Sequence, residues 1–286
     1  MIAGEVKLSR AANIGNILPE SLDYDKKGKI RVGCRERNKS IPLFFVGVLV
    51  LNIVSFALLD VDWMKLISRI PEIGGIFFKL MHLDFSDMSF VFSSFAETIS
   101  IALLSTIYSL VLGLIFGMIA AENIFRIPLL SAIVKSFFTF LRAVPTPVWV
   151  LLMLVCLGFG PSAGIAGLCV HTTAFFTKSF SQSFEDISDE TIEALEVTGA
   201  GKIRIFTNAV LPSALSQIVA WVGMRFETNF AECAILGMVG AGGIGFVIST
   251  SIQGYEYGTA GVAILLVFGF AYLVERIFVR VKKMIK

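Results

Sequence analysis

The stretch Glu193–Pro212 reads EALEVTGAGKIRIFTNAVLP, and it separates two segments that are apolar enough to cross a bilayer. At its start, apolar and acidic residues recur at helical spacing, so that one side of a short helix can be buried while the other faces water. We expect Ile192, Leu195 and Thr198 to share the first side and the acids to share the second. The stretch therefore predicts a polar loop that contains an amphipathic helix.

Residues that favour helix ends bound this short helix. Ser188 or Asp189 can cap its beginning near Thr191, where acids also interact favourably with the helix dipole. Gly199 is predicted to end it, because glycine readily adopts the left-handed conformation that closes many helices. Pro212 stands where a new helix can begin, since the first residues of a helix need no N–H.

The composition is that of an integral membrane protein. Hydrophobic residues make up 56% of the 286 residues and charged residues 16%, against about 45–50% and about 25% in soluble proteins. A chain of this length has room for roughly six or seven membrane helices of about 20 residues each. The net charge of +2 does not suggest nucleic-acid binding.

We predict an all-α polytopic membrane protein with three regions. Residues 1–40 form a cytosolic N-terminal tail, residues 41–92 hold the first transmembrane helix and an external loop with an interfacial helix, and residues 93–286 form the core domain, with the polar loop at about 185–212. Basic residues at both termini and in the polar loop place all three in the cytosol, which requires an even number of spans. About six spans are predicted, near residues 41–59, 94–120, 128–159, 163–184, 213–236 and 258–278.

Two segments are expected to have irregular backbone. The third predicted span is interrupted by Pro145 and Pro147, and proline removes a backbone donor and clashes with the preceding turn, so this helix should be kinked or broken. Five glycines between Gly237 and Gly245 permit close helix approach and a gate near the external surface. A flexible loop between spans is the alternative reading of these glycines.

The polar loop resembles the cytosolic coupling loop of ATP-binding-cassette (ABC) importer permeases. That loop has the pattern Glu-Ala-Ala, three residues, Gly, nine residues, Ile, one residue, Leu-Pro, and its spacing is kept here by Glu193-Ala194-Leu195, Gly199 and Leu211-Pro212. Leu195 replaces the second Ala, and Ala209 stands where Ile is usual. On this motif alone, an ordinary amphipathic loop helix is the alternative.

Further motifs are similar to those of the permease subunit of phosphonate ABC transporters. In chain order they are RAVPTPVW at residues 142–149, GFGPSAG at 158–164, His171-Thr172 and GAGGIG at 240–245. The resemblance covers the chain from about Glu97 to the C-terminus. It implies the ABC importer permease fold in a multi-pass protein of the bacterial inner membrane.

The resemblance also implies the partners. These are a second copy of the chain, two cytosolic subunits that bind ATP and Mg, and an external solute-binding protein that delivers phosphonate or a related phosphorus oxyanion. The chain itself is then a transport subunit and not an enzyme, without a cofactor or metal of its own. One departure concerns the substrate: the family commonly reads Glu-x-Asn-x-Arg where this chain reads Glu227-Thr228-Asn229-Phe230-Ala231, so the substrate range can differ.

The candidate site residues form two groups. The ATPase-coupling group implied by the resemblance is Glu193, Ala194, Gly199, Leu211 and Pro212. The group proposed to line the translocation path or its gate is Arg142, Pro145, Thr146, His171, Glu227, Asn229, Gly240, Gly242 and Gly243.

Ionisable side chains within membrane spans are costly and usually face a cavity or a partner. Those within or near the predicted spans are Lys135, Arg142, His171, Lys178, Arg225, Glu227 and Glu232. Arg142 and His171 lie deepest and are the preferred path residues, whereas Lys135 and Lys178 lie near the cytosolic ends. A packing role for His171, and a cap or an ion pair with Glu227 for Arg142, are the alternatives.

Two glycine motifs resemble nucleotide-binding loops and are rejected. Gly240–Gly245 fits G-x-G-x-x-G, but a dinucleotide site needs a preceding strand and a βαβ unit. Gly199–Lys202 resembles the end of a phosphate loop, yet Glu196 takes the place of the first Gly and Ile203 that of the Ser or Thr that would meet magnesium. We therefore expect no ATP hydrolysis by this chain.

Three other functions are alternatives to this one. A permease of the same superfamily for another small solute, such as methionine or a quaternary amine, is the nearest alternative. A membrane-embedded enzyme is disfavoured by the two histidines and the lack of an H-E-x-x-H motif or clustered metal ligands. A self-sufficient channel would give the polar loop no role.

Overall fold

The structure is a computed structural model that describes residues 35–59 and 62–284. Helices make up nearly all of these described residues, and no strand occurs among them, which confirms the predicted all-α class. Contacts divide the chain into one unit that ends at Ile70 and a second, Pro71–Lys286. The predicted N-terminal tail lies almost wholly outside the described residues.

The first unit contains α2 (Arg35–Leu58) and the beginning of α3 (Trp63–Met81). All side chains of α2 from Ile41 onward are exposed, and this apolar surface suits a helix surrounded by lipid. Phe56 stacks on Trp63, with ring centroids 5.4 Å apart. The helix predicted within the external loop is α3, which has no buried residue.

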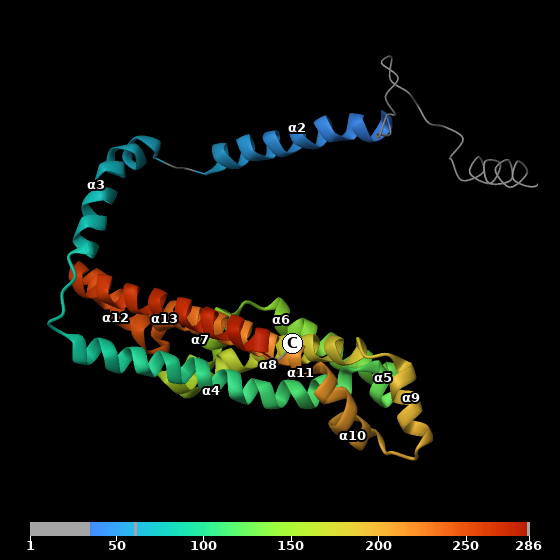
Figure 1. Ribbon diagram of the computed structural model, residues 1–286. Helices are drawn as coiled ribbons and strands as arrows, with labels where there is room; N and C mark the ends of the chain where they lie inside the picture. The colour runs from blue at the N-terminus through green and yellow to red at the C-terminus, as the bar shows by residue number, and fades with distance from the viewer. Residues whose placement is uncertain (1–34, 60–61, 285–286) are drawn as a thin grey trace, which may run out of the picture. The chain divides into compact units, whose positions relative to one another are not determined.

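Two long helices, α4 (Met88–Ala120) and α8 (Pro161–Glu185), pack along each other in the second unit (Figure 1). Glycines on α4 permit this close approach. A Cβ atom at Gly117 would lie 2.9 Å from the Cβ of Phe180, and one at Gly113 would clash with Phe176. The α4–α8 pair is therefore the frame on which the other helices assemble.

The predicted break in the third span is present. Helices α6 (Pro128–Ala143) and α7 (Thr146–Leu157) meet at an angle of 86°. Val144, between them, has the extended backbone that a following proline imposes, with φ −84° and ψ 125°. Pro145 then occupies the N-cap position of α7.

The polar loop forms α9 (Asp189–Val197), and a continuous helical run follows it. The run consists of α10 (Lys202–Ile205), the π-helical turn η1 (Phe206–Val210) and α11 (Leu211–Leu236). Pro212 lies in the first turn of α11, as predicted, but α11 continues a helical run that already starts at Lys202. The π turn changes the hydrogen-bond register just before Pro212, which accommodates a ring that would otherwise clash with the preceding turn.

The remaining elements are α5 (Glu122–Phe125) after α4, and η2 (Gly237–Ala241), α12 (Ile244–Gln253) and α13 (Tyr257–Met284) after α11. Within the second unit, α9 and α10 lie at one end and α12 lies at the other (Figure 1).

The count of membrane spans is approximate. By length and composition, four described helices can cross a membrane, or five if the bent α6–α7 pair is one span. Six spans were predicted, and the one that is not counted among these five is the fourth, α8. Its 25 residues are long enough at about 1.5 Å per residue, but it carries many hydroxyl groups. Most of these are buried against neighbouring helices, so α8 does not need the uniformly apolar sequence of a lipid-exposed span.

Candidate functional site

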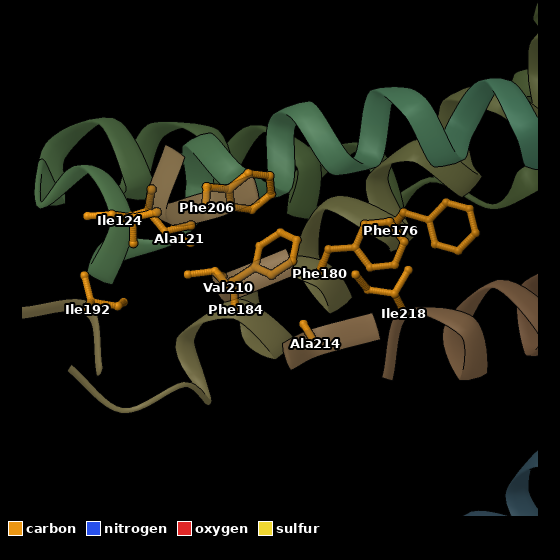
Figure 2. Packing of buried hydrophobic residues seen from close by; sticks show 11 residues of the cluster. Ala121, Ile124, Phe176, Phe180, Phe184, Ile192, Phe206, Val210, Ala214 and Ile218 are labelled. Carbon is orange, nitrogen blue, oxygen red and sulfur yellow. The ribbon is translucent and has the colours of Figure 1, made fainter. Parts of the chain in front are cut away.

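Helix α9 is amphipathic as predicted and rests on an apolar core. Ile192 is 2% exposed and packs with Ile124, Phe206 and Val210 (Figure 2). Leu195 packs against the same cluster. Thr198 does not share this buried side, because it is exposed beyond the last turn and donates a hydrogen bond to the Leu195 carbonyl. The helix begins at Asp189, two residues before the predicted start.

Ionic contacts fasten α9 to the short turn that follows α4. Arg126 ends α5 in a left-handed conformation, with φ 53°. Its guanidinium lies 3.4 Å from the Glu193 carboxylate and 3.3 Å from that of Glu196. Beyond α9, Lys202 donates to the Phe125 carbonyl at 2.9 Å. The polar loop is thus held to the α5 turn by residues within α9 and just beyond it.

A second ionic group ties the same turn to α6 and α8. The Lys135 ammonium lies 2.9 Å from Glu122 and 2.8 Å from Glu185. Glu185 also accepts a hydrogen bond from the Glu122 backbone N–H at 2.9 Å. The hydrogen bond and the charge of Lys135 hold the pKa of the Glu122 carboxyl below its ordinary value. This turn is consequently joined to α6, α8, α9 and α10.

The other predicted coupling residues lie on the surface of the loop or at the start of α11. Ala194 and Pro212 are exposed and Leu211 is half-buried. Gly199 is also exposed, with φ 76°, and a Cβ atom there would meet nothing within 4 Å. The constraint at Gly199 is therefore its backbone conformation and not a lack of space.

A buried arginine organises a polar cluster between α8 and α11. Arg225 is 5% exposed. Its Nε donates to the Thr172 hydroxyl at 3.2 Å, and its Nη2 lies 3.0 Å from His171 Nδ1 and 3.5 Å from a Glu232 carboxylate oxygen. Buried charges need such partners, because removal from water is costly.

The cluster continues into α4 through a fully buried amide. Thr172 donates to Asn229 Oδ1 at 2.9 Å, and Asn229 Nδ2 donates to Thr106 Oγ1 at 2.9 Å. Thr106 in turn donates to the Ala102 carbonyl. Asn229 is 0% exposed, so this chain of hydrogen bonds fixes the relative positions of α4, α8 and α11.

Arg142 lies beside the same aromatic ring as Arg225. The guanidinium carbons of Arg142 and Arg225 lie 5.5 Å and 5.7 Å from the centroid of the Phe175 ring. Arg142 is exposed, and it forms no ion pair with any described residue, so the alternative pairing with Glu227 is not seen. Two cationic side chains from different helices thus contact one ring, and each contact is a favourable cation–π interaction.

The predicted path residues are only partly brought together. His171 and Asn229 belong to the Arg225 cluster, while Pro145 and the buried Thr146 form the break between α6 and α7. Glu227 instead lines a groove with residues of α11 and α13. The sequence placed Arg225 and Glu232 among the ionisable residues near spans but did not select them as path residues, and it did not indicate Thr106. The spacing of Arg225, Asn229 and Glu232, at i, i+4 and i+7, places them on one helix face and could have indicated that Arg225 and Glu232 belong to the same cluster as Asn229.

The glycine-rich segment is irregular as predicted and is held by α4. Gly240, Gly242 and Gly243 have φ values of 112°, 82° and 74°. The backbone N–H of Gly243 donates to the Glu97 carboxylate at 3.0 Å, and that of Ile244 donates to Thr98 Oγ1 at 2.7 Å. These two α4 side chains were not selected from the sequence, because nothing local to residues 97–98 indicates the contact.

The described residues contain no group of three or more His, Cys, Asp or Glu side chains placed to hold a metal ion. The site is instead one of hydrogen bonds and fixed charges.

Comparison with known proteins gives a family match. The family described as "Binding-protein-dependent transport system inner membrane component" matches residues 113–282. A phosphate-import permease protein of Mycolicibacterium smegmatis is 29% identical over 233 residues, which are 81% of this chain and 44% of that protein. The chain thus spans less than half the length of this relative. A phosphite transport system permease protein of Stutzerimonas stutzeri is 28% identical over 229 residues, which are 80% of this chain and 82% of that protein.

Solved structures share the fold. The methionine ABC transporter MetNI, in inward-facing conformations, has a chain that is 22% identical, with a TM-score of 0.63 over 71% of this chain and 100% of that one. A bacterial ABC transporter involved in the import of alginate has a chain that is 13% identical, with a TM-score of 0.60 over 87% of this chain and 98% of that one. The arrangement of helices is therefore that of ABC importer permeases.

Proposed function

The chain belongs to the family of binding-protein-dependent transport system inner membrane components, and we propose that its transport substrate is phosphonate or a related phosphorus oxyanion. In this proposal the chain pairs with a second copy of itself. Two cytosolic subunits bind and hydrolyse ATP with Mg, and an external solute-binding protein delivers the anion. Both termini and α9 face the cytosol of a bacterial cell.

The observation that carries the substrate class is the pair of cations around Phe175. Arg225 is buried beside His171, and Arg142 is exposed near the same ring without an acidic partner among the described residues. A cation at partial membrane depth attracts an anion strongly, because the local dielectric constant is low. Relatives named for phosphite transport and phosphate import support the same class.

Coupling to ATP hydrolysis is assigned to α9. Movement of the ATPase subunits would displace α9, and its contacts with Arg126 and with the apolar core would carry that displacement to α4, α6 and α8. The 86° break at Val144-Pro145 and the glycine-rich segment are the places where the path would open or close, because both already depart from regular helix.

The test is uptake by the complete transporter. The chain is co-expressed with its ATPase and binding protein and reconstituted in vesicles, and ATP-dependent accumulation of phosphite, methylphosphonate and phosphate is measured. Methionine and glycine betaine serve as controls for the alternative substrates. Accumulation of a phosphorus oxyanion alone supports the proposal. Accumulation of only methionine or glycine betaine would overturn it.

A further inference from the structure

The glycine-rich segment, Gly237–Gly245, leads into α12, a helix that has no cap of its own. Gly243 occupies the N-cap position and has no side chain that could accept from the first turn. The first N–H groups of a helix lack partners within it. Here the partners come from α4: the Gly243 N–H donates to the Glu97 carboxylate at 3.0 Å. The next N–H, of Ile244, donates to Thr98 Oγ1 at 2.7 Å. Helix α4 therefore caps α12.

The contact with α4 requires glycine at two positions. A Cβ atom at Gly242 would lie 2.9 Å from Glu97 Oε1, and one at Gly243 would clash with the Thr98 hydroxyl. Both glycines also have left-handed φ values, 82° and 74°, that disfavour other residues. The backbone of the segment thus approaches α4 too closely for a side chain to stand between them.

Glu97 is an unusual capping group, because it is an acid within a predicted span. Such groups are costly there and usually face a cavity or a partner. Glu97 forms no ion pair with the described residues, and among them the Gly243 N–H is its hydrogen-bond partner. The positive end of the α12 dipole adds to the attraction. Since Glu97 is half-buried, water can replace Gly243 as its partner, which makes the contact reversible.

The other side of the segment is joined to the end of α7. Gly160, which follows α7, donates its N–H to the Gly240 carbonyl at 3.1 Å. The Phe159 ring lies against Gly240, where a Cβ atom would clash with it. The opposite end of α7 is the 86° break. We therefore expect the segment and α7 to move together when the segment leaves α4.

We propose that Glu97 is a positioning residue of the gate, which holds the glycine-rich segment and the end of α7 against α4 through its bond to Gly243. The inference rests on the proposed function, which assigns opening of the path to this segment. While the bond holds, the gate moves only when the ATPase subunits act, so ATP hydrolysis and transport stay matched. Without the bond the gate opens out of step, and ATP is hydrolysed without transport.

The experiment measures the number of ATP molecules hydrolysed per solute molecule accumulated, with the complete transporter in vesicles. Glu97→Asp keeps the charge but is one methylene shorter, Glu97→Gln keeps an acceptor oxygen at the same reach, and Glu97→Ala keeps neither. The ratio should rise up to about tenfold in the Asp and Ala variants, as for loss of a hydrogen bond to a charged group, and stay near wild type in Glu97→Gln. Glu256→Ala is the matched control, since it removes an exposed acid just beyond the other end of α12.

Hydrogen exchange of the peptide that contains Gly243 and Ile244 is followed in the same complexes and should be faster in the Asp and Ala variants. Faster exchange with an unchanged ratio would make Glu97 a structural cap alone, and unchanged exchange would mean that it does not hold the segment. Either result overturns the proposal. A higher ratio in Glu97→Gln but not in Glu97→Asp also overturns it, because charge and not reach would then matter.

The same measurement separates this proposal from the proposed substrate. If the wild-type complex accumulates methionine or glycine betaine instead of a phosphorus oxyanion, the ratio is measured for that solute. The proposed substrate is then rejected, while the role of Glu97 is still tested.

Discussion

Arg142 tests the anion path most directly, because it is exposed and its loss leaves no buried acid uncompensated. Replacing it with Gln removes one cation beside Phe175 and should lower phosphite uptake roughly three- to tenfold per assembled complex, while Arg142→Lys should retain part of the activity. Uptake is divided by the amount of chain that co-purifies with the ATPase. Unchanged uptake per complex in Arg142→Gln would remove this residue from the path.

Arg225 differs from Arg142 because it is buried, so its loss is expected to affect the packing of α8 and α11. Arg225→Gln leaves Glu232 without its cation and should destabilise the protein by about 2 kcal/mol. Adding Glu232→Gln to this variant should recover part of that loss, because no unpaired carboxylate then remains. Thermal unfolding of the two single variants and the double variant in detergent measures the coupling. Strictly additive effects would show that the two charges do not interact.

Gly199 lies just beyond the end of α9 and tests the role of that helix. Its left-handed backbone means that any other residue is strained by roughly 1–2 kcal/mol, whereas the space around it is open. Gly199→Ala should therefore keep most of the uptake, and Gly199→Trp should abolish it without loss of membrane insertion. The difference between these variants is bulk at a surface that we propose contacts the ATPase subunit. If both variants transport equally, no partner packs against this end of α9.

We expect ATP to be bound and hydrolysed by a partner subunit and not by this chain. Gly240–Gly245 runs from a π-helical turn into α12 with no strand before it, and Lys202 of the second glycine motif donates to the Phe125 carbonyl. Neither motif therefore has the setting of a phosphate-binding loop. The purified chain should show no ATPase activity and no ATP binding in equilibrium dialysis, while the complex with its ATPase shows both. Tight ATP binding by the chain alone would contradict this.

Features with local causes were predictable from the sequence. Pro145 breaks the third span because its ring and missing N–H act on the adjacent turn, and Gly240, Gly242 and Gly243 allow irregular backbone because they lack a Cβ. The spacing of Ile192 and Leu195 likewise determined which side of α9 is buried. The hydrophobic composition indicated a membrane protein, because a bilayer requires apolar side chains wherever the chain crosses it.

Contacts between distant residues were decided only by the tertiary structure. Asn229 meets Thr106 across 123 positions, and Gly243 meets Glu97 across 146, so no local pattern pairs them. Packing against neighbours also allowed α8 to carry hydroxyl groups that weaken its resemblance to a span, and it directed Glu227 to a groove away from His171. The physical reason is that helix propensity and proline or glycine effects act within a few residues. Which polar groups become partners depends instead on how whole helices pack, and a buried polar group must find its partner there.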